Sequence, residues 1–210
     1  MANLKLVESS RAVVTKINVA LAKEIDGAFR KRSSSIRNRI KPIIASALFG
    51  SPEIVSLQGG LLRFDFGLTG DPGPQIVNAV VESLQVKIEK TRGNANGISG
   101  GLTLSIQPSD YSNLLTLPVA MQALEIEGSV PWLEWLLFAG DSIIIAHYGV
   151  EYGAGLGRSG GAHMVNLKDA PLGPYKVNSA FSGTIDNNFI TRAMSRVSGE
   201  IKNTVIGALK

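Results

Sequence analysis

The stretch PWLEWLLFAGDSIIIAHYGVEYGAGLGRSGGAHMVNL, residues 131–167, decides the class of fold. Pro131 at a first turn predicts a short helix over 132–138, and the β-rich run over 142–152 predicts a strand. Glycines crowd the next nine positions, and residues 162–167 then read as a second strand rather than a helix. A strand that returns in this way is antiparallel, and no strand–helix alternation indicates a parallel doubly wound sheet.

Both ends of the chain are predicted to be helical. Apolar residues recur at three- and four-residue spacing over 9–31 and again from Ile36 to about Leu48, with the serines 33–35 separating two helices. The same spacing predicts a final helix over 187–210.

The middle of the chain is predicted to hold the remaining strands. Residues 61–66 read as a short strand, and 86–91 and 102–108 as an antiparallel pair joined by a long, mobile, glycine-rich loop. The expected fold class is α+β, with a central antiparallel β-sheet, long N-terminal and C-terminal helices and a long glycine-rich β-hairpin loop.

One domain is expected over 1–210. Its parts are a basic helical N-terminal region (1–50), a sheet-containing core (51–183) and a C-terminal helix (184–210).

Composition excludes several classes of site and of protein. The chain has no cysteine, which excludes disulfides, thiolate catalysis and cysteine metal sites. It shows no signal peptide and no run of about 18 apolar residues, so a soluble intracellular product with no membrane contact is expected.

Charge is unevenly placed along the chain. Residues 1–41 hold ten Lys or Arg and three acids, which leaves +7; the whole chain carries +4, so the rest carries −3. Such a basic segment can contact nucleic acid, an acidic partner or a neighbouring copy. The candidate contact residues are Arg30, Lys31, Arg32, Arg37 and Arg39.

Two catalytic-looking motifs overlap in the glycine run. Gly155, Gly157 and Gly160 form GxGxxG, but no helix is predicted after them to hold a pyrophosphate. Ser159 forms the centre of GxSxG, but no acid and histidine follow in the order that a hydrolase needs, and His163 is only four residues away. We therefore interpret the run as a flexible loop that serves movement and fit between subunits.

His147 and His163 could share a metal if their strands pair, but two histidines alone do not make a site. Trp132 and Trp135 lie three residues apart on one helix face, where they read as core or interface anchors. We expect no catalytic, cofactor or metal site.

The segments GGLLRFDFGL, PWLEWLLFAGDSIIIAHYGVEYG, GRSGGAHM and NNFITRAM resemble virion structural proteins of tailed bacteriophages. Their order is similar to that of tail-completion, or head–tail connector, proteins. The matching pieces are Gly60 with Leu62-Arg63, the segment from Tyr148 to Gly153, and Phe189 with Ala193. An insertion, PWLEWLLFAGD, departs from that pattern.

The resemblance implies a non-enzymatic ring component of the phage neck that joins the portal region of the capsid to the tail. It implies a homo-oligomer of about six copies, or about twelve on a portal, with other neck and tail proteins as partners, DNA in the lumen, and assembly into the virion in the host cytoplasm. The expected interface residues are Trp132, Trp135, Tyr148, Tyr152, Arg158 and Phe189. A tail terminator, a baseplate protein and a DNA-binding accessory protein remain as alternatives.

Overall fold

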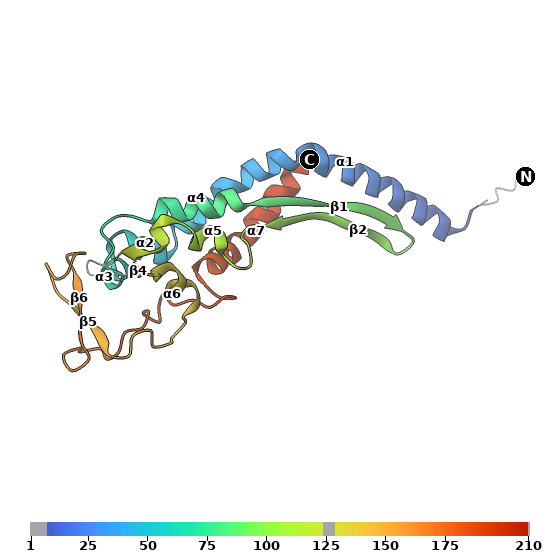
Figure 1. Ribbon diagram of the computed structural model, residues 1–210. Helices are drawn as coiled ribbons and strands as arrows, with labels where there is room; N and C mark the ends of the chain where they lie inside the picture. Colours follow the sequence, from blue (N-terminus) through green and yellow to red (C-terminus); the bar gives the residue numbers. More distant parts are fainter. Residues whose placement is uncertain (1–7, 124–128, 210) are drawn as a thin grey trace, which may run out of the picture.

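The computed structural model describes residues 8–123 and 129–209 and confirms an α+β fold with long helices at both ends (Figure 1). The terminal helices are α1 (Ser10–Phe49) and α7 (Phe189–Leu209). Between them lie α2 (Pro52–Gly59), α3 (Leu61–Asp65), α4 (Gly73–Ser83), β1 (Gln85–Asn94), β2 (Gly97–Ser105), α5 (Ser112–Leu115), the 3-10 turn η1 (Pro118–Ala120), β3 (Gln122–Ala123), β4 (Ser129–Val130), α6 (Trp132–Phe138), β5 (Tyr148–Tyr152) and β6 (Ala162–Asn166).

The two helices predicted near the N-terminus are one helix of 40 residues, α1, about 60 Å long. The serines 33–35 do not break it, and Pro42 also lies inside it. Its second half is fixed by tertiary packing, because Ile36, Ile40 and Ile44 recur every four residues and are fully buried. That burial outweighs the weak helix propensity of the serines.

The strands form three separate antiparallel pairs, β1–β2, β3–β4 and β5–β6. The first hairpin is longer than predicted, because residues 92–94 and 97–101 are strand and only a tight turn remains. Gly100 has φ of +89°, and a Cβ there would lie 2.5 Å from the Lys90 carbonyl oxygen. The glycines thus accommodate a register irregularity between Glu89 and Arg92 instead of forming a mobile loop. The long glycine-rich hairpin loop of this fold is 153–161, between β5 and β6.

Two other predicted strands are wrong in extent or type. Residues 61–65 form α3, because the hydroxyl of Ser56 accepts a hydrogen bond from the Leu62 backbone N–H and starts a new helical turn. Within 142–152 only Tyr148–Tyr152 is a strand, and Ile145 makes a single bridge to Tyr175.

One cluster of buried apolar side chains joins α1, α2, α4, α6 and α7. Trp132 and Phe189 both belong to it, and the indole N–H of Trp132 donates to the Val119 carbonyl at 2.7 Å. The Asn188 side chain starts α7, accepting hydrogen bonds from the backbone N–H groups of Ile190 and Thr191.

The first half of α1 and the β1–β2 hairpin project together from this core, and we call them the arm (residues 10–31 and 85–105; Figure 1). The hairpin lies against α1, where the Asn18 amide donates to the Asn94 carbonyl at 2.7 Å. Gly93 packs directly on the α1 backbone, since a Cβ there would lie 2.2 Å from the Asn18 carbonyl. The remaining elements near α3, β5 and β6 lie at the opposite end of the molecule, which we call the head.

Candidate functional site

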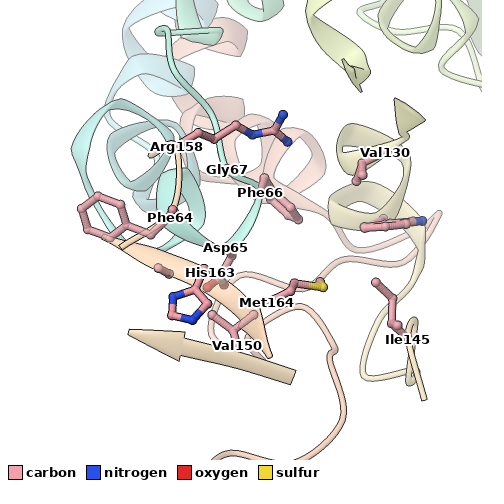
Figure 2. Close-up of a pocket in the computed structure, with 13 residues that line it drawn as sticks. Phe64, Asp65, Phe66, Gly67, Val130, Ile145, Val150, Arg158, His163 and Met164 are labelled. Atoms are coloured by element: carbon pink, nitrogen blue, oxygen red, sulfur yellow. The ribbon is translucent and has the colours of Figure 1, made fainter. Parts of the chain in front are cut away.

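In the head, α3 and the β5–β6 hairpin border an open cavity of about 460 Å³ (Figure 2). Three polar residues border it, Asp65, Arg158 and His163. Its other side chains are aromatic or aliphatic: Phe64, Phe66, Val130, Trp135, Ile145, Val150, Ala162 and Met164. This is the composition expected of a ligand or side-chain pocket, a mainly apolar wall with a few polar groups.

Strand register supplies one wall of the cavity. Val150 lies opposite Met164, and Tyr152 lies opposite Ala162. Because side chains alternate along a strand, these four residues share one face of the pair. On the other face Glu151 lies opposite His163, with 3.6 Å between the Glu151 Oε2 and His163 Nε2 atoms.

Asp65 is the main polar group of the site. It is the last residue of α3, and the chain turns away at Gly67 with φ of +63°. Its Oδ1 atom accepts a hydrogen bond from the Tyr152 hydroxyl. Burial raises the pKa of the Asp65 carboxyl to about 6, although that hydrogen bond acts in the opposite direction. Burial and the same hydrogen bond raise the pKa of Tyr152.

Three side chains around this site hold buried polar atoms that have no hydrogen-bond partner among the described residues: Ser159 Oγ, His163 Nδ1 and the Tyr175 hydroxyl. Tyr175 is 4% exposed, and its ring centroid lies 6.0 Å from that of Trp135. Burial raises the pKa of Tyr175, and the charge of Asp65 adds to the effect. Buried polar groups are normally paired with protein or with water, so these atoms can bond a further group.

The glycine loop is folded onto α3 and is not a free tip. Gly153 donates to the Gly161 carbonyl, and Gly155 donates to the Gly160 carbonyl. A Cβ on Gly161 would lie 2.5 Å from the Phe64 ring. Gly161 therefore serves close packing within the subunit, whereas Gly155 and Gly160 supply φ of +79° and +76°. The run is a folded loop held by its own hydrogen bonds rather than an open, flexible one.

Arg158 lies in this folded loop rather than reaching outward. A Cβ on Gly67 would be 3.0 Å from the Arg158 Nε atom, and Nη1 donates to the Ala123 carbonyl at 2.6 Å. Figure 2 shows the guanidinium turned away from Asp65.

The structure divides the six predicted interface residues. Trp132 and Phe189 are buried in the core at 0% and 1% exposure, so neither can contact a partner of the folded chain, which corrects that prediction. Trp135, Tyr152 and Arg158 come together at the head cavity. Tyr148 is exposed at the start of β5.

The five basic residues predicted to contact nucleic acid do not share one face. Arg30 pairs with Asp26. Arg32 donates to the Ala208 carbonyl, and Arg37 donates to the Glu82 carbonyl, so both cap helix ends within the subunit. Lys31 and Arg39 are exposed, and at about 100° per residue Arg39 lies on the opposite side of α1 from Arg37, two residues earlier.

The catalytic-looking motifs lead into strand β6. There is no helix after GxGxxG at which a pyrophosphate could bind. Ser159 Oγ and His163 Nδ1 are each without a partner in the described chain, so no hydrogen bond joins them. His147 lies opposite Leu167 and thus four positions from His163 along the hairpin. No group of three potential metal-ligating side chains occurs among residues 8–123 and 129–209.

Sequence reasoning missed Asp65 and Tyr175. The available signal for Asp65 was a lone acid between two phenylalanines, a pattern that suits a carboxylate enclosed by apolar groups. Tyr175 lies in a segment without regular structure and carried no such signal.

Within the described residues, no single helix is long and apolar enough to cross a membrane; only α1 and α2 taken together across a 59° bend reach that composition. Comparison of the chain with protein-family models, with curated proteins and with solved structures finds no match.

Proposed function

We propose that this chain is a non-enzymatic structural subunit that assembles with copies of itself into a ring, as a neck or tail-completion component of a tailed-phage virion. The observation that carries the proposal is the arm. Of the α1 residues before Ile36, only Ala22 is buried. Five larger apolar side chains in the same half-helix are exposed: Val13, Val14, Ile17, Val19 and Leu21.

These side chains are arranged for contact with another helix or sheet. Val14, Ile17, Leu21 and Ala28 recur at three-, four- and seven-residue spacing, so they lie along one side of α1. The hairpin covers a different side, through Asp26, whose carboxylate accepts a hydrogen bond from the Thr91 backbone N–H at 3.3 Å. Covering the exposed stripe would contribute roughly 1 kcal/mol per large side chain, because each is already partly buried and full burial is worth about 1.5–3 kcal/mol.

A second copy suits the arm through shape and charge. The arm holds eight Lys or Arg and three acids, a charge of +5, which leaves −1 for the rest of the chain. A basic arm at one end and a more acidic body at the other favour a head-to-tail contact between different surfaces. Contacts of that type close into rings when the rotation between copies allows it, and ring closure is the arrangement implied by the resemblance to phage neck proteins.

The test is the mass of the full-length chain by light scattering and mass photometry, with negative-stain images. We expect rings for the natural sequence and a folded monomer for Ile17→Glu combined with Leu21→Glu. Leu172→Glu is the matched control, because Leu172 is an exposed leucine (71%) outside the arm. A natural chain that stays monomeric at all concentrations contradicts self-assembly. Its absence from purified particles of the phage that encodes it contradicts the virion assignment.

A further inference from the structure

The Asp65 carboxylate in the head cavity has fewer hydrogen-bond donors and cations around it than a carboxylate normally has. Asp65 accepts one hydrogen bond, from Tyr152, at Oδ1. No Lys or Arg among residues 8–123 and 129–209 forms an ion pair with it. A carboxylate that is largely withdrawn from water normally has a cation or several donors as partners.

One group behind the cavity wall is also unpaired. The Tyr175 hydroxyl is buried without a partner among the described residues, and the Tyr175 ring packs against Trp135, which lines the cavity. Arg158, the nearest cation in the cavity lining, is held by the Ala123 carbonyl instead. A ligand with several N–H donors and a positive charge would bond the Asp65 carboxylate, whereas the negative charge of Asp65 would repel an anion.

The apolar walls of the cavity favour a ligand whose remaining atoms are apolar. Phe66, Trp135, Val150 and Met164 present apolar surface around the polar groups, and Figure 2 shows the Met164 and Val150 side chains close to Asp65. Aromatic faces also attract cations, by about 0.5–2 kcal/mol in known cases. An unbranched aliphatic stem that ends in an ammonium group fits both the walls and the acceptors, because it offers three donors on an apolar chain.

We propose that the head cavity is a binding site for a primary alkylammonium group, held by Asp65 between the aromatic walls. Two sources share this chemistry, a lysine side chain of a second copy and a free amine. The lysine source rests on the proposed ring assembly. It is supported by the exposed lysines Lys23 and Lys90 of the arm, which projects from the core away from the head (Figure 1).

The first arm of the test is a tryptophan-fluorescence titration of the full chain with n-butylammonium chloride at pH 7.5 and constant ionic strength. Asp65→Asn should weaken binding about tenfold to a hundredfold, the loss of one charged hydrogen bond. Asp141→Asn, an exposed carboxylate outside the cavity lining, is the matched control and should bind like the natural chain. The uncharged probe 1-butanol should not distinguish the variants.

A measurement on the unaltered chain covers the case in which Asp65→Asn fails to fold. Binding should weaken as the pH is lowered from 7.5 to 5, because Asp65 becomes protonated. The other charged or titratable groups near it are Tyr152, Tyr175, His163 and Arg158. Both tyrosines stay protonated in that range, since their pKa values are raised. His163 pairs with Glu151 on the other face of the hairpin, and His163→Gln is a control that should keep the pH dependence of the natural chain.

The second arm distinguishes the sources. Isotope-labelled and unlabelled copies are mixed, treated with a zero-length carbodiimide crosslinker and digested for mass spectrometry. A crosslink between Asp65 and a lysine of a differently labelled copy identifies the lysine source. Saturable binding of n-butylammonium without such a crosslink identifies a free amine as the natural ligand.

The outcomes also separate this inference from the proposed function. A monomer that binds n-butylammonium in an Asp65-dependent way contradicts ring assembly and supports the site. Rings with neither amine binding nor an Asp65 crosslink support assembly and overturn the site. Equal binding by the natural chain and by a folded Asp65→Asn variant overturns it as well.

Discussion

Replacing Asp65 by Asn should stabilise the free chain at neutral pH. The asparagine side-chain oxygen can still accept the hydrogen bond that Tyr152 donates to Asp65, so the local geometry is kept while the charge is removed. In the folded chain burial raises the pKa of the Asp65 carboxyl to about 6, from 3.8 for an unperturbed aspartate. A pKa raised in this way means that the folded state disfavours the ionised form.

The pH window follows from these two values. Below about pH 4 the carboxyl is protonated in both states and costs no stability. Between about pH 4 and 6 the unfolded chain loses its proton first, so the free energy of unfolding falls as pH rises. Above about pH 6 the whole cost is present. At about 1.4 kcal/mol per pKa unit the upper bound is about 3 kcal/mol, and partial exposure of Asp65 reduces the expected gain for Asp65→Asn to about 1–3 kcal/mol.

The assay is urea unfolding followed by tryptophan fluorescence at several pH values between 4 and 8, at one low protein concentration so that assembly does not contribute. The difference between Asp65→Asn and the natural chain should be near zero at pH 4 and grow to its full value by pH 7.5. Asp141→Asn should change stability by less than about 0.5 kcal/mol. An Asp65→Asn chain that is less stable than the natural one at pH 7.5 would refute the reasoning, because the charge would then be well compensated within the subunit.

Two further predictions concern other parts of the fold. Gly93→Ala should cost about 1–3 kcal/mol and speed amide exchange in the hairpin, because its Cβ would overlap the Asn18 carbonyl; Gly27→Ala, with open space at its Cβ, should instead stabilise α1 by up to about 1 kcal/mol. Arg192→Met should cost about 3 kcal/mol in urea unfolding, because it leaves the buried Glu53 carboxylate without its 2.6 Å partner, and Glu53→Gln in the same chain should restore part of the loss.

Sequence reasoning predicted those helices and strands whose apolar residues repeat at a regular spacing over a short stretch of chain. The spacing of apolar residues located α7 and both halves of α1, Pro131 located α6, and strand-like runs located the paired strands β1–β2 and β5–β6. The errors arose where long-range contacts decide the outcome. The serines 33–35 have weak helix propensity, but the buried isoleucines that follow them in α1 hold one continuous helix.

The cavity could not be predicted in the same way. Asp65 and Tyr152 are 87 residues apart, and their contact depends on α3 packing under the β5–β6 hairpin. Sequence reasoning treated 61–66 as a strand, which gave no reason to place a carboxylate beside the glycine loop. The glycines were conspicuous in the sequence, but their role depends on what a Cβ would touch, such as the Phe64 ring beside Gly161.

The arm and the cavity each present groups that lack a partner within the described part of the subunit. The arm exposes apolar and basic side chains, and the Asp65 carboxylate in the cavity forms no ion pair with a described Lys or Arg. They lie at opposite ends of the molecule (Figure 1), so one copy cannot satisfy one with the other. Natural chains keep such costly features where function requires them. A head-to-tail contact would satisfy both surfaces at once, and it would make the stability gained by Asp65→Asn in the free chain a loss in the assembled ring. If the arm of one copy binds the cavity of the next, Asp65→Asn must raise the stability of the monomer and lower the stability of the assembly.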